Sequence, residues 1–332
     1  MRGNTTSEWL IIVFWVDDII LASSNMDMIH NMKESLSKRF KMDDRGELRW
    51  FLGIDIRRKS DGTVLMSQVR YISSILQRFG MTESRPISSP SEKALQLSKG
   101  TDEEHEAFKQ LNFPYRQAIG SLIYLVMATR PDISWIVSKL SQFLDRPSVS
   151  HVTAFKRVLR YLKGTSSHEL VFSPSDNILS GYADSDWAGD TDDRRSTTGY
   201  IFTLGSAPIS WRTRKQPTVA LSSCEAEYMA LAEATKESIY LRKLCLALDI
   251  TQTKSTVIHC DNQGALALTK HDGKQHQRTK HIDVRYHFVR EQKDISYQYI
   301  ETTENLADLM TKSLGTVQHR LLTHKIQIEG AC

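Results

Sequence analysis

Cysteine is scarce in this sequence, with only Cys224, Cys245, Cys260 and Cys332 among 332 residues. None of them is spaced as a CxxC pair or as a cysteine and histidine metal motif, and four cysteines in so long a chain do not form a disulfide framework. We therefore expect reduced thiols in an intracellular protein.

Long apolar runs are also missing. The run from Trp9 to Val16 stops at two aspartates, and neither a basic region nor a cleavage site surrounds it. A helix that spans a bilayer needs about 20 apolar residues, so this run is too short to be a membrane anchor. We expect no membrane association.

A strong excess of one charge is absent as well, because the formal net charge is only +4. This balance excludes a chain that is basic throughout, so an anionic partner would have to bind a local patch. The apolar fraction of 40% is sufficient for ordinary cores, and the length suggests about two domains.

The first half of the sequence predicts strands followed by helices. The apolar run that is broken by Asp17-Asp18 and resumes at Ile19 is typical of two buried strands with a tight acidic turn. We predict a helix over residues 28–40, two strands around Ser60-Asp61-Gly62 and a short helix that ends at Gly80. Residues 85–103 have little periodicity and indicate a linker, and three helices are predicted over residues 115–129, 132–147 and 152–164.

The remaining part alternates in a different way. Strands are predicted over residues 178–187, 200–204, 209–214, 256–260 and 295–300, with helices over 224–248, after residue 262 and over 304–312. This order is typical of an α/β layer arrangement with a mixed sheet.

Four acidic residues stand in contexts that suggest metal chemistry. Asp184 and Asp261 lie in or at the end of predicted strands, Glu227 lies in the first turn of the long helix, and Asp308 lies in the last helix. If the fold gathers them, their charges repel one another unless a cation is shared. Carboxylate oxygens suit Mg²⁺, and two ions held about 4 Å apart activate a water and stabilise a leaving oxyanion in phosphodiester hydrolysis.

Each of these acids alone has an ordinary alternative, because an isolated Asp or Glu near an element end is usually a cap or a solvated charge. Glu225 lies on the same helix as Glu227 but about 200° around it, so only one of the two can face a site. We choose Glu227, which flanks an apolar face. Asp186 points the same way as Asp184 along its strand.

Basic residues gather in two places. Arg212, Arg214 and Lys215 end a predicted strand, and Lys274, Arg278, Lys280 and Arg285 lie in a basic stretch over residues 270–290. Both suit phosphate binding, and the alternative is a solvated charged loop. A zinc site at His281, Asp283 and His287 is disfavoured by its spacing. The aromatic residues Tyr182, Trp187, Tyr200 and Trp211 fall within strand patterns and predict sheet core rather than base stacking.

Five segments together resemble a known family: GYADSDWAGDTDDRRSTTGYIFTLGSAPISW, SSCEAEYMALAEATKE, CDNQGALAL, RTKHIDVRYHFVRE and ENLADLMTKSL. In content and order they are similar to the ribonuclease H domain of copia-type LTR retrotransposon Pol polyproteins. The resemblance implies that Asp184, Glu227, Asp261 and Asp308 bind two Mg²⁺ ions, with Mn²⁺ as the alternative, and that the substrate is the RNA strand of an RNA/DNA hybrid. Two departures are Cys224, where the family more often has Thr, and the lack of a His in the loop before Asp308.

The preceding sequence resembles the end of the same polyprotein's reverse transcriptase, through WFLGIDI, ILQRFGM and YRQAIGSLIYLVMATRPDISW. Asp17 and Asp18 resemble the metal-binding pair of the polymerase YVDD hairpin, with Trp15 in place of the tyrosine. Such polymerases need a further Asp from an upstream strand, which would precede Met1. We therefore expect an incomplete polymerase site and no DNA synthesis by this chain alone.

The resemblance also implies an organisation in five parts. It predicts a palm and thumb remnant of reverse transcriptase over residues 1–84, a linker over 85–110, a helical connection over 111–175, a ribonuclease H-like α/β domain with a five-stranded mixed sheet over 176–316 and a tail over 317–332. The expected partners are the hybrid and the rest of the polyprotein, in the cytoplasm within a virus-like particle or in the nucleus. The alternative is an inactive remnant that binds nucleic acid.

Overall fold

The computed structural model describes residues 8–270 and 287–330. The chain forms two compact units, residues 1–51 and residues 52–332, and each unit is described by itself. The boundaries at residues 84, 110, 175 and 316 stay a prediction.

The first unit is a hairpin with one helix. Strand β1 (Leu10–Trp15) pairs antiparallel with β2 (Asp18–Ser23), and α1 (Met26–Ser37) packs on β2, while β3 (Trp50–Phe51) ends the unit. The predicted hairpin is confirmed, but the prediction that its strands are buried is wrong, because Phe14 is 63% exposed and Trp15 is 56% exposed. A single short helix does not cover both faces of a two-stranded hairpin.

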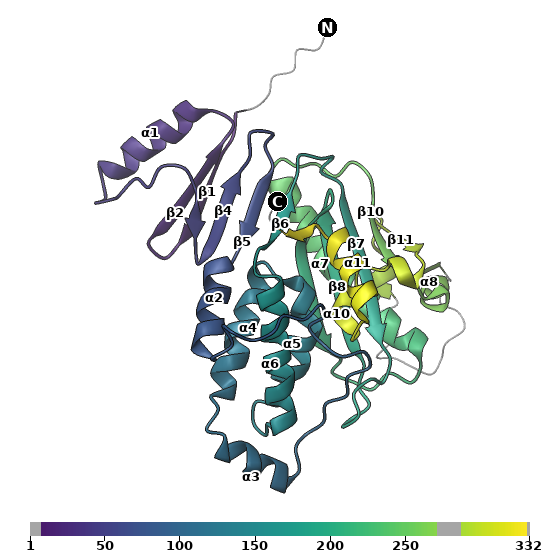
Figure 1. The fold of residues 1–332 in the computed structure, drawn as a ribbon. Helices are drawn as coiled ribbons and strands as arrows, with labels where there is room; N and C mark the ends of the chain where they lie inside the picture. The colour runs from purple at the N-terminus through teal and green to yellow at the C-terminus, as the bar shows by residue number, and fades with distance from the viewer. Residues whose placement is uncertain (1–7, 271–286, 331–332) are drawn as a thin grey trace. The chain divides into compact units, whose positions relative to one another are not determined.

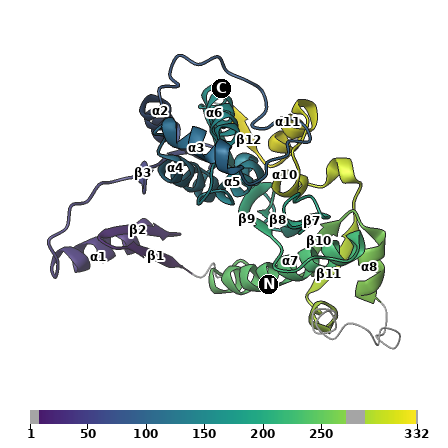
Figure 2. The ribbon, with the colours of Figure 1, turned by 90° about the horizontal axis from the view of Figure 1, so that it is seen from below.

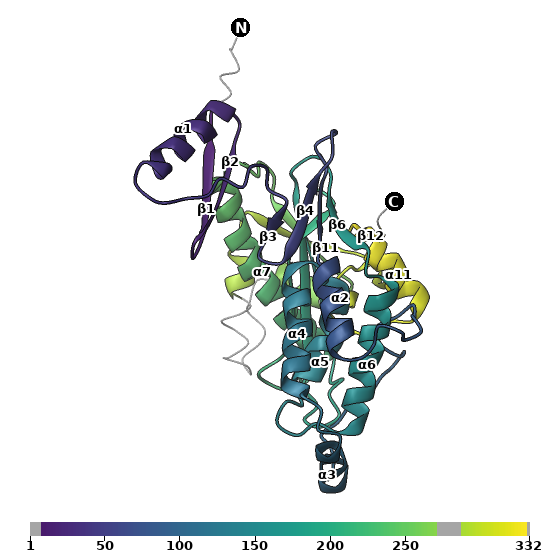
Figure 3. The same cartoon turned by 60° about the vertical axis from the view of Figure 1, so that its left-hand side comes forward.

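The second unit contains a layer of packed helices. Helices α2 (Val69–Arg78), α4 (Tyr115–Ala128), α5 (Ser134–Ser141) and α6 (Val149–Gly164) share one apolar core and lie side by side in Figures 1 and 3. Helix α3 (Asp102–Gln110) begins at a capping box in which the Thr101 and Glu104 side chains bond each other's backbone N–H. This helix lies within the stretch that the sequence indicated as a linker.

A buried ion pair ties the helical layer together just after α4. The guanidinium of Arg130, which is 1% exposed, donates to both carboxylate oxygens of Asp132 at 2.9 and 2.7 Å. The hydroxyl of Tyr161 on α6 donates to Oδ2 of Asp132 at 2.6 Å, and Nε2 of His319 lies 2.9 Å from the backbone carbonyl oxygen of Asp132. These bonds join the helical layer to α11 (Thr316–Lys325).

The main sheet has the strand order β11-β10-β7-β8-β9. Strands β7 (Leu179–Asp186), β8 (Thr197–Leu204) and β9 (Ala207–Lys215) are antiparallel neighbours, whereas β10 (Thr256–Cys260) runs parallel to both β7 and β11 (Ile295–Tyr299). Helix α7 (Ser223–Ala247) covers one face, and α10 (Asp308–Thr311) with α5 covers the other (Figure 2). The predicted mixed five-stranded sheet with helices is confirmed.

Shorter elements complete this layer. Helix α8 (Gln263–Lys270) follows β10, and short 3-10 turns occur at η1 (Pro131–Ile133) and at η2 (Thr302–Glu304), just before α10.

A second antiparallel sheet includes β4 (Ile54–Arg58), β5 (Val64–Ser67), β6 (His168–Phe172) and β12 (Ile328–Gly330), with β4 next to β5, β5 next to β6 and β6 next to β12. The predicted pair of strands around Asp61-Gly62 is confirmed, and Gly62 takes the positive φ of 89° that its turn requires. Strands β6 and β12 were not predicted, because the strands that they pair with lie far away in the sequence. Helix α11 was not predicted either.

Among the described residues, no helix is both long enough and apolar enough to cross a membrane.

Candidate metal centre

Asp184 lies on the central strand of the main sheet and Asp308 begins the short helix that packs on it. Asp184 is fully buried on β7, and Asp308 is 3% exposed. The β8 residue that pairs with Asp184 is Gly199, and a Cβ built there would lie 2.5 Å from the Cβ of Met310. The missing side chain therefore lets α10 approach the sheet closely enough to bring Asp308 beside Asp184.

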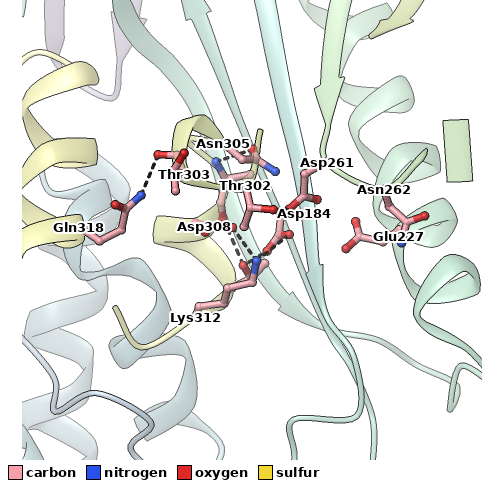
Figure 4. Close-up of polar contacts among 12 residues, drawn as sticks. Asp184, Glu227, Asp261, Asn262, Thr302, Thr303, Asn305, Asp308, Lys312 and Gln318 are labelled. Atoms are coloured by element: carbon pink, nitrogen blue, oxygen red, sulfur yellow. Dashed lines mark hydrogen bonds and ion pairs between the residues drawn. The ribbon is translucent and has the colours of Figure 1, made fainter. Parts of the chain in front are cut away.

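Asp261 joins these two residues from the neighbouring parallel strand. It follows β10 directly, and its Oδ2 accepts a 2.7 Å hydrogen bond from the hydroxyl of Thr302. One carboxylate oxygen each from Asp184, Asp261 and Asp308 lies within 4.8 Å of the others. Figure 4 shows the three side chains converging from β7, the end of β10 and α10.

Glu227 approaches from the opposite face of the sheet. Its carboxylate forms a second group with Asp261 and with Cys260, whose atoms also lie within 4.8 Å of one another. Glu225 points elsewhere, because its Oε2 accepts the Leu221 backbone N–H at 2.8 Å. The structure thus brings all four acids of the sequence prediction to one place, and Asp261 belongs to both groups.

The electrostatics of the cluster favour a shared cation. Burial and the neighbouring Asp184 and Asp261 raise the pKa of Glu227, and burial with the Asp184 charge raises the pKa of Asp308. The pKa of Asp184 is also raised by its burial, although Lys312 and Thr311 oppose this. These carboxylates are costly to ionise together without a positive partner.

Three neighbouring residues were not predicted from the sequence. Lys312 donates to Oδ1 of Asp184 at 3.1 Å and to Oδ1 of Asp308 at 2.6 Å, and Thr311 donates its hydroxyl to the other Asp184 oxygen. Asn305 is fully buried and donates to the Ala183 carbonyl at 3.1 Å, which fixes the loop before α10 to β7. The spacing of Lys312 four residues after Asp308 was the available signal.

The residues present fit divalent metal ions. All the donors that converge, apart from the Cys260 thiol, are carboxylate oxygens, which hard cations prefer, and an ammonium group already bridges two of them. The arrangement of two groups that share Asp261 is suited to two neighbouring ions.

The predicted phosphate-binding residues differ in exposure and in their ion pairs, and four of them are not described by the structure. Arg212 and Arg214 are exposed at alternate positions of β9 and line a pocket with Met229 and Glu233 of α7. Lys215 is engaged in ion pairs with Asp190 at 2.8 Å and with Asp193 at 2.9 Å. The predicted residues Lys274, Arg278, Lys280 and Arg285 lie outside the described residues, as do His281 and Asp283 of the disfavoured zinc site.

The remaining sequence predictions concern the first hairpin and the aromatic residues. Asp17 lies in the β1–β2 turn and Asp18 begins β2, and both are exposed. Among the residues that the structure covers, no third acid forms a metal-binding group with them.

The aromatic residues that were predicted to lie in the sheet core differ in burial. Tyr200 is 4% exposed, and Tyr182 and Trp211 are partly buried against the core, but Trp187 is 52% exposed and is therefore not a core residue. It follows the last residue of β7, where the sheet no longer covers it.

The chain is similar to proteins encoded by retrotransposons. It is 42% identical, over 92% of its length, to the retrovirus-related Pol polyprotein from transposon TNT 1-94 of Nicotiana tabacum, and spans 23% of that protein. It is 31% identical to a putative transposon Ty5-1 protein of Saccharomyces cerevisiae, over 70% of this chain and 75% of the relative.

The chain belongs to the copia-type retrotransposon Pol family. The family described as reverse transcriptase (RNA-dependent DNA polymerase) matches residues 1–93. Among solved structures, the foamy viral protease-reverse transcriptase in complex with double-stranded DNA is similar, with a TM-score of 0.45 and 12% identity over 88% of this chain and 46% of that chain. In this Pol-family chain the four clustered acids all lie beyond the residues that the reverse transcriptase family matches.

Proposed function

We propose that this region of the Pol chain is a metal-dependent endonuclease that hydrolyses the RNA strand of RNA/DNA hybrids. The observation that carries the proposal is the convergence of Asp184, Asp261 and Asp308, whose oxygens lie within 4.8 Å of one another, with Glu227 adjoining through Asp261. The membership of the chain in the Pol family supports a nucleic acid as the substrate.

The four acids would hold two Mg²⁺ ions, or Mn²⁺ in their place. Bound there, the ions would supply a nucleophilic hydroxide and neutralise charge on the scissile phosphate. Asp184 and Asp308 would be metal ligands at one end of the cluster, and Glu227 would be a metal ligand at the other end. Asp261, which belongs to both groups, would lie between them. Thr302 fixes the orientation of the Asp261 carboxylate through its 2.7 Å hydrogen bond, and Asn305 holds the Asp308 loop against β7.

The cationic residues outside the cluster would hold the nucleic-acid backbone. Arg212 and Arg214 are exposed on one strand and form no ion pair with an acid within the described residues, although Arg212 also interacts with the Tyr200 hydroxyl. Their guanidinium groups would bind phosphates. Lys215 would have to leave its ion pairs with Asp190 and Asp193 to do the same. The basic stretch with Lys274, Arg278, Lys280 and Arg285 stays part of the proposal from sequence.

In the first unit, we propose that Asp17 and Asp18 are two of the metal ligands of a polymerase site. Such a site needs a further carboxylate, so RNA-directed DNA synthesis is proposed for the full Pol polyprotein, whose remaining parts would be partners of this chain. The five-part organisation with boundaries at residues 84, 110, 175 and 316 is proposed on the same family resemblance.

A cleavage assay tests the nuclease proposal. Purified chain is incubated with a labelled RNA/DNA hybrid and Mg²⁺, and wild type is compared with Asp184→Asn and Asp261→Asn. Because each substitution removes a charged ligand from the cluster, we expect cleavage to slow by roughly a hundredfold or more. Asp145→Asn is the matched control, since the Asp145 side chain is 96% exposed and lies in none of the described groups of potential metal ligands.

Two results separate the proposal from its alternative. Cleavage by wild type and by Asp145→Asn, with loss in the other two variants, supports the nuclease. Binding of the hybrid with no faster cleavage by wild type than by Asp184→Asn would show an inactive nucleic-acid-binding remnant instead.

A further inference from the structure

Lys312 occupies the position in the cluster where a bound cation would be shared. Its Nζ lies 3.1 Å from Oδ1 of Asp184 and 2.6 Å from Oδ1 of Asp308. Figure 4 shows the ammonium group between the two carboxylates, on the side opposite Glu227. Both acids are almost fully buried, whereas the Lys312 side chain is 33% exposed. The lysine thus approaches the buried acids from a partly open side.

The backbone explains why the side chain reaches both acids. Helix α10 has a single turn, so Lys312 follows Asp308 by four residues and lies above it on the same side. The adjacent Thr311 donates its hydroxyl to the second oxygen of Asp184. Two consecutive residues therefore satisfy both oxygens of a fully buried carboxylate.

A metal ion and this ammonium group compete for the same oxygens. Mg²⁺ binds oxygen at about 2.1 Å, so an ion bound to Oδ1 of Asp308 would lie no more than about 4.7 Å from the Lys312 Nζ in its present place. A monovalent and a divalent positive charge at that separation repel each other strongly in a partly buried site. The lysine must then move outward, which its exposed side permits.

We propose that Lys312 is a resident counter-cation that holds the carboxylate cluster together before metal loading and is displaced when a divalent ion binds. The inference rests on the proposed metal site but concerns this chain's own lysine. It makes Lys312 a positioning residue that sets metal affinity: the lysine stabilises the empty cluster and weakens its affinity for ions.

Metal binding by the full chain, without nucleic acid, tests the proposal. We expect Lys312→Met to bind Mn²⁺ on the order of tenfold or more tightly in calorimetry, because the competing charge is gone. In EDTA the same variant should unfold at a lower temperature than wild type, and Mn²⁺ should raise its unfolding temperature more.

Lys325→Met is the matched control. The Lys325 side chain is 31% exposed and also forms an ion pair, with Glu304, but it contacts none of the four acids. It should leave Mn²⁺ affinity unchanged. If Lys312→Met does not fold, Lys312→Gln takes its place, and Lys312→Arg, which keeps the charge, should bind Mn²⁺ as weakly as wild type.

Unchanged or weaker Mn²⁺ binding in Lys312→Met or Lys312→Gln would overturn the proposal, because a lysine that stays in place beside the metal does not compete with it. The outcome is independent of the cleavage assay. Wild type that binds Mn²⁺ but cuts no hybrid would refute the nuclease and leave the displacement of Lys312 standing.

Discussion

Gly199→Ala should disturb the metal centre without touching any of its ligands. A Cβ at residue 199 would lie 2.5 Å from the Met310 Cβ, 2.6 Å from the Thr311 Cγ2 and 3.2 Å from the Met310 carbonyl carbon. Ordinary carbon contacts are about 3.5–4.0 Å long, so α10 has to move away from β8 by roughly 1 Å. Overpacking of this kind costs about 1–3 kcal/mol of stability.

The shift would reach the cluster through the residues that α10 carries. Asp308 begins this helix, and Thr311 bonds Asp184 across the same contact. A displacement of 1 Å at a catalytic group lowers rates by about a hundredfold. We therefore expect Gly199→Ala to lose most hybrid cleavage and to bind Mn²⁺ more weakly, while urea unfolding shows a loss of no more than about 3 kcal/mol.

Gly120→Ala is the control for this experiment. Gly120 lies within α4, and a Cβ there has no neighbour within 4 Å, so the change should be neutral or stabilise the protein by up to about 1 kcal/mol through helix propensity. If Gly199→Ala folds and has the metal affinity and cleavage rate of wild type, close packing of α10 does not position Asp308 and the reasoning is refuted.

Three further predictions follow from the buried polar groups. Asp132→Ala leaves the Arg130 guanidinium buried without its acid, and urea unfolding should show a loss of about 3–5 kcal/mol; a loss below 1 kcal/mol would contradict this. Burial lowers the pKa of fully buried His151 to about 4, so between pH 6.5 and 4 the unfolded chain binds a proton that the folded chain does not. The free energy of unfolding should fall on the order of 3 kcal/mol across that range, and less in His151→Gln. Mg²⁺ at a hundredfold excess over its dissociation constant should stabilise wild type by about 2.7 kcal/mol, an effect that EDTA reverses and Asp184→Asn lacks, as differential scanning calorimetry would show.

The main sheet could be predicted because its strands are marked locally. The alternation and turn residues around Asp184, and the strand that ends at Cys260, indicate both the elements and their order. Helix α7 was equally clear, with Ser222 accepting the Glu225 N–H as its cap. Periodicity alone also separated Glu227 from Glu225, since the two lie on different sides of one helix.

What could not be predicted depends on partners that are remote in the sequence. Nothing around Asp132 shows that its charge will meet a tyrosine 29 residues later, or that His319 will approach its carbonyl. The exposure of Trp187 was missed for the same kind of reason, because whether a side chain just beyond a strand is covered depends on which element packs there. The role of Gly199 emerges only when α10 is placed against β8.

The second sheet bears on how the protein reaches its native state. Strand β6 lies between β5 and β12, and β12 begins about 156 residues after β6 ends in the sequence. On a ribosome that releases roughly 5–20 residues per second, β6 would therefore wait many seconds before β12 could pair with it. During synthesis, one edge of β6 would stay open to pairing with other chains. Because the second sheet is completed only when β12 has been synthesised, its folding comes late. Chaperones that cover strand edges should therefore raise the yield of folded protein more than faster synthesis would.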